Sequence, residues 1–508
     1  MTAAVGAGQA TRREWIGLAI IALPCIVYGM DLTVLNLAVP SFSAALEPTA
    51  AQLLWIVDVY GFLAAGSLLI MGTLGDRIGR RKLLLIGSAC FGVMSVVAAF
   101  SRSAEMLIGC RALLGIAAAT MAPSTLSLIT NMFRDDREKT FAVSVWIASF
   151  SFGGAIGPAV GGLILAHFSW GAAFLAPVPV MALLLIVGPT FLPEYKTPTA
   201  DRLDVLSAVL SLAAVLPVIY GIKLAAQGGS AVGAVSAISL GIGFGALFVR
   251  RQGRLAHPLL DLRLFKRPAV TVALGIYVAD FFVGFGVLVL FAQYLQLVLG
   301  LTPLAAGLWS TPGGFGFVAG SMATSTALRL MRPARVLGLS LTIGAAGMVV
   351  MALGVPAHRL TLVAGGDVLF ALGVAPCTAI IADLVVSAAP VEQSGAAAAL
   401  SEVAAEFGGA IGIALLGSLA TLLYRSALVA TMPNGLPAAV VDTAMRGIGD
   451  AASLPRNFAG APALFSAVRS AYTGATEITF FVAAGLMVLA AIGGLAMFGE
   501  QGRAKSGE

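Results

Sequence analysis

Two glutamates four residues apart inside an apolar stretch are the residues of this sequence with the clearest potential for chemistry. Glu402 and Glu406 fall in the apolar segment 393–423, and a spacing of four places both carboxylates on one face of a helix. A carboxylate inside a membrane costs roughly 2.5–3.5 kcal/mol, and two that repel each other should titrate apart. The pair, with acids in other apolar segments, predicts a wet, protonatable path. Those other acids are Asp31, Asp58 and Asp280.

The composition places these acids in a membrane protein. Of the 508 residues, 59% are hydrophobic and 11% are charged, whereas a soluble domain carries about 25% charged residues. The net charge of +6 is no nucleic-acid signature, because the lysines and arginines fall in short loops between apolar segments. We therefore expect an all-α protein that crosses a membrane many times. Its preference for arginine over lysine and its high content of alanine and glycine indicate a bacterial genome, and so the bacterial cytoplasmic (inner) membrane.

At about 20 residues per span, the apolar segments predict fourteen membrane-spanning helices. They are 14–38, 52–74, 81–101, 104–131, 138–166, 170–192, 204–225, 230–250, 268–297, 303–328, 335–355, 360–388, 393–423 and 475–498. The excess of lysine and arginine in alternate loops predicts that residues 1–13 and the tail 499–508 are cytoplasmic. Residues 424–474 are then a long extracellular loop, either a solvated spacer or a partly packed, interfacial segment.

A glycine-rich, basic loop follows the second predicted span. Its residues could bring two helices into close approach and hold the loop on the inner side, although an ordinary positive loop would look similar. The residues that define this motif are Gly72, Asp76, Arg77, Gly79, Arg80 and Arg81.

This loop resembles the signature loop of the major facilitator superfamily, and three other segments match in register. Residues 107–119 around Arg111 resemble the arginine motif of its fourth span. Residues 31–40 and 55–60 are typical of its fourteen-span drug:proton antiporter branch (QacA- and SmvA-like multidrug efflux pumps). The segment in the fifth span is similar to the motif that marks antiporters; its residues are Gly153, Gly157, Pro158, Gly161 and Gly162.

The resemblance implies a major facilitator fold with two six-helix bundles, at 14–192 and 268–498. Two additional transmembrane helices and their linkers would occupy 193–267 between them. It also implies that Asp31, Glu402 and Glu406 couple transport to protons and recognise cationic drugs. The second half departs from the pattern, since the loop 329–335 has no acid that corresponds to Asp76.

The expected depths of Asp31 and Arg111 in the membrane are similar. At 1.5 Å per residue, Asp31 lies roughly 7 Å and Arg111 roughly 9 Å from the middle of their spans, toward the same outer face. An ion pair between them is therefore possible. The alternative is that Arg111 hydrogen-bonds to backbone carbonyl groups and holds the bundle together.

Candidate substrate-binding residues combine these acids with aromatic rings, which can stack on flat organic cations. Each ring could equally face lipid or serve packing. The candidates are Asp31, Trp55, Asp58, Tyr60, Trp146, Phe150, Asp280, Trp309, Phe315, Glu402 and Glu406.

The sequence also limits the source of energy. No lysine follows a glycine, so the Gly-Lys-Ser/Thr phosphate loop of ATPases is absent, and no histidines stand at metal-ligand spacing. We expect no cofactor, no metal and no enzymatic reaction. The predicted function is proton-coupled antiport that exports lipophilic cations, by a monomer whose other partners are protons and membrane lipids. The alternatives are a proton symporter, a dedicated exporter of one natural metabolite, and a receptor or scaffold that transports nothing.

Overall fold

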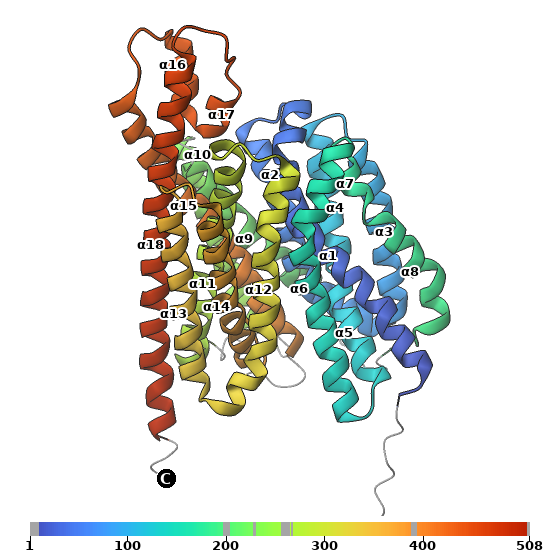
Figure 1. The fold of residues 1–508 in the computed structure, drawn as a ribbon. Coiled ribbons are helices and arrows are strands. Elements are labelled where there is room, and N and C mark those ends of the chain that lie inside the picture. The colour runs from blue at the N-terminus through green and yellow to red at the C-terminus, as the bar shows by residue number, and fades with distance from the viewer. Residues whose placement is uncertain are drawn as a thin grey trace, which may run out of the picture. The chain divides into compact units, whose positions relative to one another are not determined.

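The computed structural model describes residues 10–196, 204–226, 230–255, 265, 268–387 and 394–504. Within these ranges the regular structure is helical and contains no strand. Figure 1 shows the helices as long rods. The cores are formed by apolar side chains, as expected from the composition.

The first half of the chain forms ten helices. They are α1 (Arg12–Leu46), α2 (Ala50–Ile78), α3 (Arg80–Ala99), α4 (Ala104–Ala118), α5 (Met121–Met132), α6 (Asp136–His167), α7 (Ala172–Leu175), α8 (Val178–Phe191), α9 (Val205–Ala226) and α10 (Ala231–Gln252). The first two begin at a capping box, in which Thr11 pairs with Glu14 and Thr49 pairs with Gln52. Each box satisfies backbone N–H groups that the first helical turn leaves without a partner.

The second half forms eight α-helices and one π-helix. They are α11 (Pro268–Gln293), the π-helix η2 (Tyr294–Val298), α12 (Pro303–Leu330), α13 (Pro333–Gly354), α14 (Leu360–Ser387), α15 (Ser394–Thr431), α16 (Ala438–Arg446), α17 (Ile448–Ala452) and α18 (Ala461–Ala504).

Every predicted span coincides with one helix or with two consecutive ones. Three predicted spans are each divided: 104–131 into α4 and α5, 170–192 into α7 and α8, and 268–297 into α11 and η2. In the described part of the chain, eleven helical stretches are long and apolar enough to cross a membrane. The helices α2, α9 and α12 are not among them, so the count of fourteen spans stays a prediction.

The segment predicted as a loop at 424–474 is largely helical. Helix α15 continues to Thr431 and α18 begins at Ala461, and α16 and α17 lie between them at one end of these two helices (Figure 1). The hydroxyl of Tyr424 donates to the Ala444 carbonyl over 2.8 Å, and Nε of Arg425 donates to the Met445 carbonyl over 2.8 Å. The structure therefore favours the partly packed alternative over the solvated spacer.

The chain forms two compact units whose boundaries differ from the predicted bundles. The first comprises Met1–Pro217, Ser239–Arg263 and Ala389–Val403, and the second comprises Val218–Ile238, Leu264–Ala388 and Ala404–Glu508. The inserted helices α9 and α10 are thus divided between the units rather than forming a segment of their own. The reason is local packing: Gly66 of α2 leaves room for Leu212 of α9, whereas Gly221 of α9 lies against Ala234 of α10.

Candidate functional site

The first unit contains a buried ion pair between α1 and α4. Nη1 of Arg111 lies 2.9 Å from Oδ2 of Asp31, and the two side chains are 2% and 9% exposed. Nε of Arg111 also donates to the carbonyl of Ile56 on α2 over 3.2 Å. Arg111 therefore forms both predicted contacts, the ion pair with Asp31 and the hydrogen bond to a backbone carbonyl. Its guanidinium connects α4 to α1 and α2. Breaking such a buried pair costs about 3–5 kcal/mol.

Aromatic rings continue from this ion pair across three helices. The guanidinium of Arg111 lies 4.3 Å from the ring centre of Tyr60, a distance suited to cation–π attraction. Ring centres are 6.2 Å apart for Tyr60 and Tyr28, 5.4 Å for Tyr28 and Phe150, and 5.0 Å for Phe150 and Trp146. We call these four residues, Tyr60, Tyr28, Phe150 and Trp146, the aromatic row.

The aromatic row is fixed by its surroundings. Nε1 of Trp146 donates to the hydroxyl of Thr125 on α5 over 2.9 Å, which settles the orientation of the indole. Tyr60 is 1% exposed, while Tyr28, Trp146 and Phe150 are half-buried. The row therefore offers flat, partly accessible π faces beside a carboxylate, a combination that suits lipophilic cations. Tyr28 was missed by the sequence analysis, although it lies three residues before Asp31.

A stripe of glycines brings α6 against α1 beside this ion pair. A Cβ atom on Gly153 would lie 2.0 Å from the carbonyl oxygen of Ile26, and one on Gly157 would lie 2.0 Å from Oγ1 of Thr33. Gly161, one turn further, lies against Val34. These spacings of four put all three glycines on one face, and any side chain there would push α6 away from α1. Pro158 lies within α6 and Gly162 is buried in it.

The loop after α2 is held by an acid that the sequence analysis missed. Glu194, beyond α8, accepts from the backbone N–H groups of Arg81 and Lys82 over 3.0 and 3.2 Å. A carboxylate at a helix start complements the free N–H groups and the dipole of α3. Gly79 has φ +111° and a Cβ atom there would lie 2.5 Å from Glu194 Oε1, so this turn requires glycine.

Two arginines of the same loop bind backbone carbonyl groups. Nη1 of Arg81 donates to the carbonyls of Pro189 and Leu192 over 3.1 and 2.9 Å. Nη1 of Arg80 donates to the carbonyl of Pro123 over 3.4 Å. The predicted motif thus joins α3 to the ends of two other helices of its unit. Arg77 is exposed, and a Cβ atom on Gly72 would meet nothing within 4 Å.

In the second unit, the carboxyl of Asp280 lies between α11 and α14. It is 2% exposed, and Oγ1 of Thr378 donates to its Oδ2 over 3.0 Å. The thiol of the neighbouring Cys377 also lies beside this carboxyl. Glycines again bring a helix close, because Cβ atoms on Gly408 and Gly412 of α15 would lie 2.4 and 2.0 Å from carbonyl oxygens of α11.

Comparisons with known proteins agree with these motifs. Residues 21–413 match the family model described as Major Facilitator Superfamily. The chain belongs to the major facilitator superfamily. A solved structure with this fold is the bacterial homologue of the human lysosomal transporter Spinster, in its inward-facing, unoccupied conformation. The TM-score is 0.64 at 16% identity, over 96% of this chain and 98% of that one, and this likeness concerns the fold alone.

Two relatives within the superfamily are similar over nearly their whole length. The chain is 41% identical to "Multidrug efflux pump LfrA" of Mycolicibacterium smegmatis, over 94% of this chain and 95% of that protein. It is 32% identical to "Methyl viologen resistance protein SmvA" of Salmonella typhimurium, over 95% of this chain and 97% of that protein. Superfamily membership makes the chain a multi-pass membrane transporter and confirms that it is not an enzyme.

Apart from Asp280, Pro158 and the loop arginines and glycines described above, the predicted site residues of this superfamily member divide into three groups. Asp31, Tyr60, Arg111, Trp146 and Phe150 lie together in the first unit, as given above. Trp55 is half-buried on α2, Trp309 is half-buried on α12, and Phe315 on α12 is 49% exposed. The third group consists of acids whose backbone is helical and whose side chains lie outside the described residues: Asp58, Asp76, Glu402 and Glu406.

Polar side chains also join α9 to α10 near one end of the pair. Nη2 of Arg251 lies 2.8 Å from Oδ1 of Asp204, and Ser207 donates to the same carboxylate over 2.6 Å. Asp204 directly precedes the first residue of α9, at the very end of the predicted span 204–225. Burial raises the pKa of Asp204, but the hydrogen bonds from Arg251 and Ser207 outweigh it and lower the pKa below its ordinary value.

Proposed function

We propose that this chain exports lipophilic, mostly cationic drugs and dyes in exchange for protons, by alternating access. The observation that carries this proposal is the buried Asp31–Arg111 ion pair at 2.9 Å with the aromatic row beside it. A permanent cation that approaches the row would compete with Arg111 for the carboxylate of Asp31, while the rings bind its apolar surface. The similarity to the multidrug efflux pump LfrA supports drug export, and the similarity to the methyl viologen resistance protein SmvA supports cationic substrates, since methyl viologen is a flat dication.

In the proposed cycle, a drug enters the site from the cytoplasm or from the inner leaflet. Its charge favours the ionised acids, so that protons leave toward the inside. After the drug is released outside, protons bind the acids again and allow the transporter to return. We assign this coupling to Asp31, Glu402 and Glu406, and we assign substrate contacts to these acids, the aromatic row, Trp55, Asp58, Asp280, Trp309 and Phe315.

The proton gradient is the proposed energy source, without ATP or a cofactor. One charge that crosses 100 mV supplies about 2.3 kcal/mol, which corresponds to roughly a fiftyfold concentration ratio of a neutral substrate. We place the protein in the inner membrane with both termini cytoplasmic, and we expect it to work as a monomer among membrane lipids. The basic residues of the predicted inner loops support that orientation.

The proposal is tested by ethidium transport in inverted membrane vesicles that contain the protein. We expect accumulation of dye in energised vesicles and its loss when a protonophore collapses the gradient. Accumulation that needs ATP, or that survives the protonophore, would contradict proton coupling. In whole cells, export lowers dye retention, a symporter raises it, and a scaffold leaves it unchanged.

A further inference from the structure

The carboxyl of Asp280 is deeply buried, yet only one of its oxygens is occupied. Oδ2 accepts from Thr378, whereas Oδ1 is buried and hydrogen-bonds to no group in the described part of the chain. Buried polar groups are nearly always satisfied, so such an orphaned atom requires an explanation. A buried carboxyl with one unpaired oxygen is destabilised in its charged form, which favours a group that can take up a proton.

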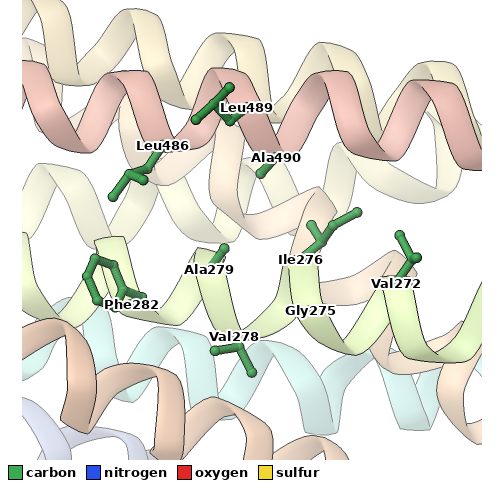
Figure 2. Close-up of a pocket in the computed structure, with 9 residues that line it drawn as sticks. All are labelled: Val272, Gly275, Ile276, Val278, Ala279, Phe282, Leu486, Leu489 and Ala490. Carbon is green, nitrogen blue, oxygen red and sulfur yellow. The ribbon is translucent and has the colours of Figure 1, made fainter. Parts of the chain in front are cut away.

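The helices around Asp280 contribute little charge. On α14 the facing groups are the thiol of Cys377 and the hydroxyl of Thr378. Between α11 and α18 lies an apolar groove of about 560 Å³ lined by Ile276, Ala279, Phe282 and neighbours (Figure 2). The third helix, α15, carries Glu402 and Glu406, whose side chains lie outside the described residues. No cation faces Asp280 from the described side chains, in contrast to the guanidinium beside Asp31.

The hydroxyl of Thr378 can serve two acceptors but has only one hydrogen. Its Oγ1 lies 3.0 Å from Oδ2 of Asp280 and 3.2 Å from the carbonyl oxygen of Val374 one turn earlier. A hydroxyl carries one O–H donor and two acceptor lone pairs. Rotation about one bond therefore decides whether Thr378 donates to the acid or to its own helix.

We propose that Asp280 and Thr378 form a proton-exchange site in the second unit, a role that rests on the proton-coupled export proposed above. When Asp280 is ionised, Thr378 donates to Oδ2. When a proton binds Oδ2, the new O–H donates to Oγ1 of Thr378, whose own hydrogen turns to the Val374 carbonyl. Only an O–H bond forms or breaks, and the pair stays hydrogen-bonded in both states. Thr378 is thus a positioning residue that makes the acid stable with and without its proton.

Proton release upon drug binding tests this inference. Purified protein in weak buffer with a pH indicator is mixed with ethidium, and released protons are counted per bound dye at several pH values. We expect the Asp280→Asn variant, which keeps an acceptor for Thr378, to release about one proton fewer than the unaltered protein. We expect Thr378→Val to move the pH midpoint of release upward by about one unit, because the hydrogen bond lost from the charged acid is stronger than the one lost from the neutral acid.

Two further variants separate this role from packing. Thr378→Ser keeps a hydroxyl and should restore the midpoint of the unaltered protein. Thr342→Val on α13 is the matched control, because its hydroxyl donates only to the Gly338 carbonyl over 2.7 Å, and it should leave the midpoint unchanged.

The outcomes also separate this inference from the proposed function. If the unaltered protein releases no protons, proton coupling itself is overturned and the site with it. If the unaltered protein releases protons but Asp280→Asn releases as many, or Thr378→Val leaves the midpoint in place, the proton-exchange site alone is wrong.

Discussion

The surroundings of Asp31 and of Asp280 are built alike and differ in one partner. Each acid lies on the first helix of its half, α1 or α11, and a glycine-bearing helix packs closely against that helix in both cases. Asp31 meets the guanidinium of Arg111, whereas Asp280 meets the neutral hydroxyl of Thr378. The same backbone framework thus supports a charge pair in one unit and a switchable hydrogen bond in the other.

This difference suggests a division of labour between the two acids. A cationic substrate can exchange with Arg111 at Asp31, because both present positive charge to the same carboxylate. At Asp280 we propose that a proton binds in addition to the substrate contact assigned above, since the described neighbours bring no charge that must be displaced. Shared architecture therefore does not imply shared chemistry, and the partner residue decides which chemistry each half performs.

We expect the largest loss of stability when the guanidinium of Arg111 is removed. Arg111→Met should cost about 3–5 kcal/mol of stability, because Asp31 is left buried without its partner. Thr378→Val, the corresponding change in the second unit, should cost about 1 kcal/mol. Thermal unfolding of the purified variants in detergent measures both. Equal losses would contradict the distinction, and the double variant Asp31→Asn/Arg111→Gln should regain part of the stability of the single arginine variant.

Replacing a close-packed glycine by alanine should destabilise both units to the same extent. This comparison tests whether the packing of α6 on α1 corresponds to that of α15 on α11. Alanine at Gly153 or Gly412 places a Cβ atom 2.0 Å from a backbone carbonyl oxygen, and such overpacking costs about 1–3 kcal/mol. The matched controls are Gly154→Ala, whose Cβ would be 3.9 Å from its nearest neighbour, and Gly417→Ala, which meets nothing within 4 Å. If only one of the two variants, Gly153→Ala or Gly412→Ala, had a lower melting temperature than its control, the two halves would be packed differently.

A smaller effect is expected from Asp31→Asn, and it should depend on the substrate. The variant keeps an acceptor for Arg111 but removes the negative charge, so export of ethidium should fall about tenfold more than export of a neutral dye. Parallel transport assays in inverted vesicles provide the measurement. Equal reduction for both dyes would assign Asp31 a purely structural or proton-binding role.

The smallest effect concerns Asp204 and Arg251, an acid–base pair nearer to solvent. The Arg251 side chain is 34% exposed, so Asp204→Asn should cost less than about 1 kcal/mol. The hydrogen bonds lower the pKa of Asp204 in the folded protein. Ionised Asp204 therefore stabilises the fold fully above its pKa in the unfolded chain, about 3.9, and this stabilisation is lost as the pH falls through the folded pKa. Melting temperatures of the variant and the unaltered protein should therefore differ at pH 7 and converge in acid. A constant difference would contradict this account.

The sequence was sufficient to predict features that depend on local composition or on depth in the membrane. Apolar length located every long helix, and counting residues from the middle of each span matched Asp31 with Arg111. These inferences succeed because a membrane restricts a chain to helices of known rise and known length.

Features that depend on distant contacts were missed. Glu194 binds N–H groups 113 and 112 residues away, and nothing in the residues around it indicates that partner. Helix α18 begins fourteen residues before the predicted span 475–498, and in this added part the hydroxyl of Tyr472 donates to the side-chain oxygen of Gln293 over 2.6 Å. The role proposed for Thr378 could not be predicted from the sequence, because it depends on the distances between its Oγ1, Oδ2 of Asp280 on α11 and the Val374 carbonyl oxygen on α14.

The contact of α6 with α1 has an evolutionary consequence. Gly153 packs against a backbone carbonyl oxygen. Because every residue has that carbonyl, no substitution in α1 can make room for a side chain at position 153, and we expect glycine to be retained there. The rings beside it have no such restriction, because one aromatic group can take the place of another. Descendants selected against a new biocide should therefore vary in the aromatic row while retaining the glycines, and resistance would change its spectrum without rebuilding its scaffold.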